Sequence, residues 1–465
     1  MKSKWQRRLF RYPEIWVLCA LALLTRLWQL DFPRAIVFDE VYFRQFASDY
    51  LNGHFFFDIH PPLVKLVFAG IGALFHLGAS GVADGDPGGW ILRALPALAG
   101  AALVPLMYVI IRQLGLGRRM AAFGALLVLC DNALLVESRF VLMDSLLLLA
   151  GMGALSSYLQ LRRTKKGLYR WLWVIATAVL LGTLVSTKWT GLAIAGLIFF
   201  TWIIDGVLRK IQWQQLIAEG AAALAIIATI YIGCFAVHFA LLTHSGDGDA
   251  FMSQKFQSTL VGNENYKASA KMSLWDKIVE YNAEMYSAQN SLESVTHPYA
   301  SRWYSWPFET RSVYFWQGEA QKDGSQGNIY LLGNPAVWWL SAVGMFTALG
   351  VWLLKPAWLG KRRRLVAFLL TGYALNFVPF TFITRPMFLY HYLFALLFSM
   401  LVTVVMLSLL FTWQREKYGR RAVTQTYWAL VVIIVLGFIN FIPLSYGWPM
   451  TPDDLQMHMW LPSWR

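Results

Sequence analysis

The feature of this sequence that most restricts its fold is a series of long apolar segments that recurs along the whole chain. A helix needs about 20 residues to cross a hydrocarbon core about 30 Å thick, and its backbone polar groups must be satisfied internally. We therefore predict an all-α integral membrane protein with about eleven transmembrane helices. Apolar segments of this kind are expected near residues 14–30, 91–111, 120–136, 139–160, 171–187, 189–205, 216–240, 335–354, 365–383, 387–412 and 426–443.

The composition supports a membrane protein and argues against a nucleic-acid partner. Hydrophobic residues make up 57% of the chain and charged residues 14%, against about 25% charged residues in ordinary soluble domains. The 22 Trp residues suit the headgroup region, where one end of an indole ring stays hydrated. The net charge of +14 comes from basic residues between apolar segments, which form no basic face interleaved with aromatics. The three cysteines lie in apolar segments, so we predict no disulfide there.

The distribution of Lys and Arg predicts the orientation of the chain. With the N-terminus in the cytoplasm, the cytoplasmic segments are MKSKWQRRLFR, RQLGLGRR, RRTKKGLYR, the pair Arg209 and Lys210, KPAWLGKRRR and REKYGRR. They hold more than half of the 40 Lys and Arg residues, as the positive-inside rule requires. The basic start and apolar run are similar to a signal peptide, but the length of the run favours an uncleaved first span.

This orientation places two long loops, 31–90 and 241–334, on the non-cytoplasmic side. They hold most of the acidic residues, and the second is rich in Tyr and Trp. Loops of this size are usually functional or disordered, and the aromatic residues argue against disorder. We therefore divide the chain into an N-terminal transmembrane module (1–240) that contains the first loop, a covering loop (241–334) and a C-terminal transmembrane module (335–465).

The first loop carries an adjacent acid pair, Asp39 and Glu40, followed by an HPPLVK element from His60 to Lys65. A carboxylate beside a membrane surface is partly desolvated, which raises its pKa and makes it a better proton acceptor near neutral pH. Nearby cations lower the pKa. The ordinary alternatives are a solvated acid pair or a helix N-cap, and a membrane-surface anchor for Lys65.

Three further cations lie within spans or at their outer ends: Arg26, Arg93 and Lys188. Ionisable groups at such depth are expensive and are usually paired or functional. Cations that converge near a carboxylate suit a phosphate-bearing ligand, because Arg offers planar bidentate donors to phosphate oxygens. The alternative is that each cation pairs with a local acid, for example Arg139 with Glu137 or Asp144.

Motifs follow one another along the chain in the order of a known family. They are VFDEVYFRQFASDYLNGHFFFDIHPPLVK, LCDNALLVESRFVLMDS, STKWTG, HFALLTHSGDGDAFMSQKFQSTLVGN, HPYASRWYSWP, LLGNPAVWW and RPMFLYHYLFAL. This ordered set resembles the dolichyl- or polyprenyl-phosphate-mannose protein O-mannosyltransferases, which are multi-span glycosyltransferases that use lipid-phosphate sugars. The resemblance covers almost the whole chain.

The resemblance implies transfer of mannose from a polyprenyl-phosphate-mannose donor to Ser and Thr hydroxyls of proteins, on the non-cytoplasmic face. Asp39 matches the family's proposed base, so 31–90 would be the catalytic loop. Glu40 would orient Asp39, a cation or the acceptor. The expected reaction is one displacement with inversion, from a β-linked donor to an α-mannoside.

The resemblance also implies positions for the donor phosphate. Arg26 and Arg93 are the first candidates, and Lys65 and Lys188 are weaker ones. The leaving phosphate is already a stable anion, so fixed positive charge suffices and no protonating acid is required. The lipid-linked sugar is a substrate, and no cofactor is expected.

A further set of residues is expected to bind or support the substrate: His60, Asp144, Arg139, Arg385 and His391. Asp144 resembles a second family carboxylate, with an ion pair to Arg139 as the competing explanation. His60 and His391 have no partner at zinc-like spacing such as HxxxH, so no metal is predicted.

The chain departs from the family pattern in its second loop. Eukaryotic members carry a β-trefoil insertion there, and 241–334 is too short to hold one, which implies a compact bacterial-type member in a plasma membrane. An enzyme of the same architecture with a lipid or glycan acceptor, such as lipid A, is one alternative. A transporter is another, but transporters bind near the bilayer midplane and often contain repeats, and neither is evident here. The residues show no dimer face, so no oligomeric state is predicted.

Overall fold

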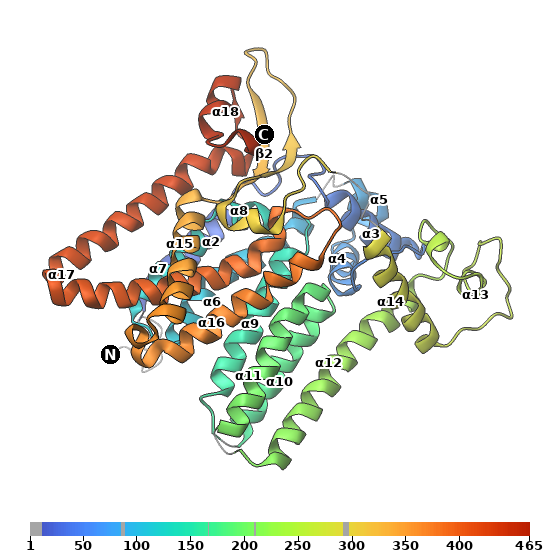
Figure 1. Cartoon of the computed structure of the whole chain (residues 1–465). Coiled ribbons are helices and arrows are strands. Elements are labelled where there is room, and N and C mark those ends of the chain that lie inside the picture. The colour runs from blue at the N-terminus through green and yellow to red at the C-terminus, as the bar shows by residue number, and fades with distance from the viewer. Residues whose placement is uncertain (1–11, 85–88, 166, 209–210, 292–296) are drawn as a thin grey trace, which may run out of the picture.

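The structure is a computed structural model that describes residues 12–84, 89–165, 167–208, 211–291 and 297–465, and it is mainly helical (Figure 1). The α-helices are α2 (Pro13–Leu27), α3 (Glu40–Asn52), α4 (Leu63–Leu74), α5 (Gly78–Asp84), α6 (Gly89–Gln113), α7 (Arg118–Leu129), α8 (Asn132–Glu137), α9 (Asp144–Leu161), α10 (Leu168–Val185), α11 (Leu192–Leu208), α12 (Trp213–Leu241), α13 (Gln254–Gln257), α14 (Leu274–Ser291), α15 (Pro335–Leu354), α16 (Arg363–Leu375), α17 (Leu393–Tyr446) and α18 (Pro452–His458). The strands are β1 (Val313–Gln317), β2 (Gln326–Leu331) and β3 (Pro449–Met450).

Seven helical segments in the described part of the chain are long and apolar enough to cross a membrane. The chain is therefore a multi-pass membrane protein, as its hydropathy predicts. The segments are Gly89–Gln113, Leu168–Val185, Trp189–Leu208, Trp213–Leu241, Pro335–Leu354, Pro356–Phe382 and Leu389–Tyr446.

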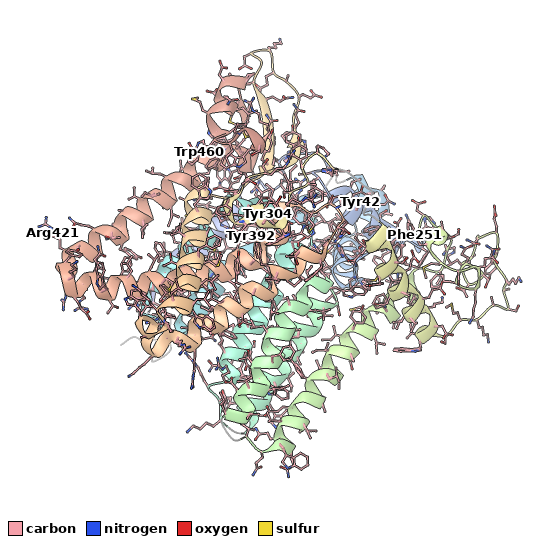
Figure 2. All side chains as sticks on the ribbon, viewed as in Figure 1. Tyr42, Phe251, Tyr304, Tyr392, Arg421 and Trp460 are labelled. Carbon is pink, nitrogen blue, oxygen red and sulfur yellow. The ribbon has the colours of Figure 1, made fainter. Side chains whose placement is uncertain are left out.

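The last of these segments contains two of the expected spans, because α17 bends sharply in its middle. Gly419 has a φ of +81°, a backbone conformation that glycine adopts without steric cost. Figure 1 shows the two arms of α17 meeting at the left edge of the molecule, and Arg421 lies at this bend in Figure 2. The two arms correspond to the expected spans 387–412 and 426–443.

Three expected spans are occupied by shorter helices. α2, α7 and α9 have 15, 12 and 18 residues, and α7 alone is only about 18 Å long at 1.5 Å per residue. The expected span 120–136 is divided into α7 and α8, because Asp131 caps a new helix between them. The total number of crossings stays a prediction.

The two long loops lie on the same side of the molecule and contact each other. In Figure 1 the helices α3, α4 and α5 of the first loop lie near α14 of the second, whereas the bend of α17 and the lower ends of α11 and α12 lie along the left and lower edges. The backbone N–H of Phe55 donates to the carbonyl oxygen of His244 at 2.8 Å. The elements expected to carry the chemistry are thus gathered at one end of the helix bundle.

A small antiparallel sheet in the order β1-β2-β3 is an addition to the all-α prediction. β1 and β2 come from the second loop, and β3 comes from the C-terminal segment. β2 is buried along almost its whole length, so it lacks the alternating pattern that reveals a half-buried strand. The sheet and the buried ring of Trp464, whose Nε1 donates to the carbonyl oxygen of Glu309, join the second loop to the C-terminus.

Asp131 connects the N-terminal and C-terminal halves of the bundle. Its side chain caps α8 by accepting from the backbone N–H of Leu134 at 2.9 Å. It also accepts from Trp338 Nε1 of α15 at 2.7 Å and from the backbone N–H of Asn334 at 3.3 Å. A buried carboxylate with three donors is well compensated, and it fixes α8 against the second half of the chain.

We expect Asp131→Ala to lower the free energy of unfolding by about 2–3 kcal/mol, because a helix cap and two further bonds to a charged acceptor are lost. Thermal unfolding in detergent, followed by Trp fluorescence, measures this effect. Asp453→Ala is the matched control, since Asp453 is exposed in α18. Equal melting temperatures for the two variants would contradict the role of Asp131.

Candidate active site

The position of Asp39 is fixed by the residue on each side of it. Asp39 is the N-cap residue of α3, and Phe38 before it has a φ of +50°, a left-handed conformation that is a true outlier for a bulky residue. Phe38 is held by β1: its N–H donates to the carbonyl oxygen of Phe315 at 3.2 Å, and the two rings stack with centroids 4.3 Å apart. Strained residues of this kind gather at functional sites.

The side chain of Asp39 lines a small cavity of about 50 Å³, here called the acidic pocket. Segments that are far apart in the sequence meet there, including the start of α3, the HPP turn, the α8–α9 region and the residues before α11 and α17. The pocket is lined by Phe38, Asp39, Phe43, His60, Glu137, Leu142, Met143, Asp144, Lys188 and Tyr390. The sequence-predicted residues Asp39, His60, Asp144 and Lys188 are thus brought together.

Burial controls the titration of this pocket. The pKa of Asp39 is raised to about 6, mainly by burial and also by the carboxyl groups of Asp144 and Asp58, while the Lys188 ammonium opposes the shift. Burial, together with Lys188 and Lys65, also holds the pKa of His60 well below its usual range, so His60 is neutral at pH 7. Asp39 can therefore take up a proton near neutral pH.

Asp144 forms an ion pair with Lys188, which corrects the expected alternative of a pair with Arg139. Lys188 Nζ lies 3.1 Å and 3.4 Å from the two carboxylate oxygens of Asp144 and 5.5 Å from the ring centroid of Tyr390. Arg139 instead donates to the carbonyl oxygens of Trp28 at 2.6 Å and Gln29 at 2.8 Å. The reason is that Arg139 points toward the end of α2, where carbonyl groups lack helical partners.

Glu40 is bound to a cation, which was one of its three expected partners. Its carboxylate accepts from Arg93 Nε at 2.8 Å and Nη2 at 2.7 Å. It also accepts from the backbone N–H groups of Val37 at 3.0 Å and Val141 at 2.8 Å. Arg93 donates in turn to the carbonyl oxygens of Pro33 and Ala35. The Glu40–Arg93 pair is buried and joins the first loop, α6 and the α8–α9 loop.

Arg26 and Arg93 lie outside the lining of the acidic pocket. Arg26 is fully buried and donates to the carbonyl oxygens of Leu129 and Val128, both at 3.1 Å. The Nε, Nη1 and Nη2 atoms of Arg93 are engaged by Glu40 and by loop carbonyl groups. Protein acceptors therefore occupy the Arg93 donors and the Nη1 and Nη2 atoms of Arg26, while Arg26 Nε has no partner within the described residues. Their assignment to the donor phosphate stays a prediction.

Lys65 holds the HPP turn in place. Its Nζ pairs with the carboxylate of Asp58 and donates to the carbonyl oxygen of His60 at 2.7 Å. The backbone N–H of Asp58 is in turn bonded to the hydroxyl of Tyr281 in α14, at 3.0 Å. Through these contacts the second loop fixes the turn that presents His60 to the acidic pocket.

A larger cavity of about 340 Å³, here called the apolar groove, adjoins the acidic pocket. The two cavities share Asp144, Lys188 and Tyr390. Its remaining lining is mostly apolar and comes from α9, from α11 and the residues before it, from α16 and the residues after it, and from the start of α17. These lining residues are Leu147, Leu148, Trp189, Thr190, Leu192, Ala193, Leu375, Asn376, Pro379, Phe380, Ile383, His391, Leu393 and Phe394.

His391 lines the apolar groove, whereas Arg385 lies outside the lining of both cavities. The His391 ring stacks on Tyr390, with centroids 4.6 Å apart. Arg385 interacts electrostatically with Tyr390, His60 and His391, and within the described residues it forms no ion pair with an acid. Arg385 is therefore a cation that a ligand can use.

Three residues of the site were absent from the sequence-predicted set: Glu137, Tyr390 and Asp58. Glu137 was considered only as a partner of Arg139, although it stands seven residues before Asp144 in the same motif. Tyr390 is part of the FLYHY element that contains His391, and Asp58 precedes His60. Their neighbours in the motifs were the available signal.

Comparison with known proteins relates the chain to one family. A family model described as "Dolichyl-phosphate-mannose-protein mannosyltransferase" matches residues 16–243, and one described as "C-terminal four TMM region of protein-O-mannosyltransferase" matches residues 274–464. The dolichyl-phosphate-mannose–protein mannosyltransferase 4 of Candida albicans is 36% identical over 56% of this chain. Protein O-mannosyl-transferase 1 of Rattus norvegicus is 37% identical over 53% of it. These matches cover 37% and 36% of the relatives' own lengths, so the chain spans about a third of them.

Solved structures share the fold over nearly the whole chain. The Saccharomyces cerevisiae protein O-mannosyltransferase Pmt1-Pmt2 complex bound to the sugar donor gives a TM-score of 0.85 at 20% identity, covering 97% of this chain and 92% of that one. ArnT from Cupriavidus metallidurans bound to undecaprenyl phosphate gives 0.52 at 15% identity, covering 96% and 77%. The fold is therefore that of multi-span membrane glycosyltransferases.

The Glu40–Arg93 pair generates a test. We expect Glu40→Leu to lower the free energy of unfolding by about 3–5 kcal/mol, because Arg93 is left as an uncompensated buried charge. The double variant Glu40→Leu with Arg93→Leu should be less destabilised than Glu40→Leu alone, since Arg93 is no longer stranded and only Arg44, whose Nη2 lies 3.6 Å from Glu40 Oε1, is left without its acid. Melting temperatures in detergent distinguish the outcomes, and additive losses in the double variant would show that the two side chains act independently.

Proposed function

Because the chain belongs to the dolichyl-phosphate-mannose protein mannosyltransferase family, we propose that it transfers mannose from a polyprenyl-phosphate-mannose donor to Ser and Thr hydroxyls of proteins. The observation that carries this proposal is the junction of the acidic pocket, which contains Asp39, with the apolar groove at Lys188. A lipid-linked phosphosugar has an apolar tail, an anionic centre and a polar sugar in that order, and the junction offers matching surroundings in the same order.

The donor is proposed to lie with its isoprenoid tail in the apolar groove. The groove is lined mostly by aliphatic and aromatic side chains, which suit a hydrocarbon chain. The related ArnT structure is bound to undecaprenyl phosphate, and the related Pmt1-Pmt2 structure is bound to the sugar donor. These two ligand-bound structures support the same class of ligand for this chain.

We propose Lys188 and Arg385 as the main contacts of the donor phosphate. Lys188 lies in the lining of both cavities, and Arg385 interacts with His60 and Tyr390 beside it. The Nη1 and Nη2 atoms of Arg26 and the guanidinium donors of Arg93 are occupied by the protein, and within the described residues only Arg26 Nε is left unbonded. Arg26 and Arg93 would then have a structural role, and they would add a positive electrostatic potential at the donor phosphate without contacting it.

The proposed reaction is one displacement at the anomeric carbon. Asp39 accepts the proton of a Ser or Thr hydroxyl as that oxygen attacks the carbon, and the bond from the carbon to the phosphate oxygen breaks. The phosphate leaves with the electron pair as polyprenyl phosphate, and Lys188 and Arg385 stabilise its charge. Attack opposite to the leaving group inverts the configuration, from a β-linked donor to an α-mannoside. No metal or cofactor enters this scheme.

We further propose that the N-terminus is cytoplasmic and that the site faces the non-cytoplasmic side of a bacterial plasma membrane. The basic segments of the sequence support this orientation. The bend of α17 carries Arg421 and lies at the edge opposite the two loops (Figures 1 and 2). The acceptor would then approach the acidic pocket from the side of the loops.

A transfer assay tests the function. Purified protein given radiolabelled polyprenyl-phosphate mannose and a Ser/Thr-rich peptide should form alkali-labile peptide mannose. Asp39→Asn should reduce the rate by at least about 100-fold, since a general base contributes roughly 10²–10⁴-fold. Asp31→Asn, in an exposed position of the same loop, should leave the rate unchanged. Transfer only to a lipid would refute the protein acceptor, and full activity of Asp39→Asn would refute the base.

The pKa of Asp39 sets the expected pH dependence. A base must be deprotonated to act, so kcat/KM should fall about tenfold per pH unit below roughly pH 6, the value to which burial raises this pKa. Lys188→Met removes the cation that lowers the pKa of Asp39, so the acidic limb of the profile should move to higher pH. An acidic limb that stays in place or moves to lower pH would contradict the assignment, whatever the maximal rate of the variant.

A further inference from the structure

Glu137 differs from Asp144 and Glu40 because, within the described residues, its Oε2 atom has no hydrogen-bond partner. Its side chain is 2% exposed and lines the acidic pocket. Asp144 by contrast pairs with Lys188, and Glu40 binds Arg93 and two backbone N–H groups. The scheme proposed above gives Glu137 no role.

The chain around Glu137 is rigid, so the orientation of its carboxyl group is built into the fold. Asp131 caps the start of α8 and binds Trp338. Directly after Glu137, Ser138 packs against Gly100 of α6, where an added Cβ would lie 2.4 Å from the Ser138 Cβ. Arg139 is held by the carbonyl groups at the end of α2. A long polar side chain is thus fixed in the wall of the pocket, and the described part of the chain offers no partner to its Oε2 atom.

The surroundings of Glu137 disfavour its charged form. The groups that face it are Asp39 from the start of α3, Asp144 from α9 and Lys188 before α11. Burial and the two acids raise the pKa of Glu137 well above its usual range, and Lys188 only partly opposes them. An uncharged carboxylic acid offers one O–H donor and one carbonyl acceptor. A buried group of this kind is costly to leave unbonded.

The order of groups in the donor identifies the missing partner. With the tail in the apolar groove and the phosphate at Lys188, the sugar is the next group and lies at the acidic pocket. The pocket volume of about 50 Å³ is between one and two times the volume of a water molecule in the liquid, so it accommodates the edge of a hexose ring. A ring hydroxyl both donates and accepts a hydrogen bond, which matches both oxygens of the acid.

We propose that Glu137 recognises the donor sugar, with its carboxyl group hydrogen-bonded to a hydroxyl of the hexosyl ring. The proposal rests on the proposed function, because it takes a lipid-phosphate sugar as the ligand. It assigns different tasks to the acids of the pocket: Asp39 handles the acceptor proton, Asp144 holds Lys188, and Glu137 selects and orients the sugar.

Two uncharged variants of similar size test this assignment. Glu137→Gln keeps a donor and an acceptor, whereas Glu137→Met keeps the volume and loses both. We expect kcat/KM for polyprenyl-phosphate mannose to fall severalfold in Glu137→Gln and about 10- to 100-fold in Glu137→Met, from the cost of leaving a polar partner unpaired. The KM for the peptide acceptor should be unchanged. Glu416→Gln, exposed at the bend of α17, is the control for unaltered activity.

Donors that lack a single sugar hydroxyl provide a further test, because a purely structural role of Glu137 would not change how the protein discriminates between them. The test compares kcat/KM for the 2-, 3-, 4- and 6-deoxymannosyl donors in the wild-type protein and in Glu137→Met. One of these donors should have a low kcat/KM with the wild-type protein, and Glu137→Met should not lower it further, because the deoxy donor and the variant each remove the same hydrogen bond. Fully additive losses for all four donors would overturn the proposal. Equal activity of Glu137→Gln and Glu137→Met would also overturn the proposal. So would a shift of the acidic limb of the kcat/KM profile to lower pH in both variants, because that shift would show that Glu137 is charged in the wild-type protein.

Donor binding separates this proposal from the proposed function. Polyprenyl-phosphate mannose should raise the melting temperature of the wild-type protein, and it should do so less in Glu137→Met than in Glu137→Gln, since a bound ligand stabilises in proportion to its affinity. If the wild-type protein binds the donor but transfers nothing to peptide, the proposed function fails while the role of Glu137 is still measured. If both variants bind the donor as the wild-type protein does, the role of Glu137 fails alone.

Discussion

The buried ion pair of Glu40 and Arg93 is the interaction on which the site depends. It connects α3, α6 and the α8–α9 loop, and Glu40 also accepts from two backbone N–H groups that no helix satisfies. Because Glu40 is fixed in this way, the adjacent Asp39 stays outside the ion pair and lines the acidic pocket. Two neighbouring acids thus have opposite surroundings, one fully compensated and one poised to titrate. Phe38 also fixes the position of Asp39, because its backbone is left-handed and its ring stacks on the ring of Phe315 in β1.

A second constraint is the boundary between polar and apolar surroundings at Lys188. This residue follows the end of α10, where the chain leaves the apolar part of the bundle, and its ammonium group lies between Asp144 and the ring of Tyr390. On one side are carboxyl groups and on the other a groove of aliphatic and aromatic side chains. An amphiphile with a charged centre is the ligand that such a boundary fits. The second loop contributes indirectly, since Tyr281 and β1 hold the HPP turn and Phe38 in place.

Hydropathy and motif order were sufficient to predict the helical membrane fold, the two loops on one side and the set Asp39, His60, Asp144 and Lys188. They were insufficient for contacts between distant parts of the chain, because local periodicity carries no information about them. Arg139 shows this: an ion pair with a nearby acid, Glu137 or Asp144, was the alternative considered, but its guanidinium group binds carbonyl groups more than 100 residues away. The buried strand β2 has no alternating pattern, and the break at Asp131 divides a segment that is apolar throughout. Arg26 and Arg93 have the right chemistry for phosphate, yet the structure engages their donors elsewhere.

The central claim is that the acidic pocket and the apolar groove together form the site of a lipid-phosphate sugar beside Asp39. The most direct measurement is a structure of the protein with polyprenyl-phosphate mannose bound, using Asp39→Asn to prevent turnover. The account predicts the isoprenoid tail among Leu148, Leu192 and Phe394, the phosphate at Lys188, and the anomeric carbon close to residue 39. A donor bound with its sugar away from the acidic pocket, or with its phosphate on Arg26, would contradict it.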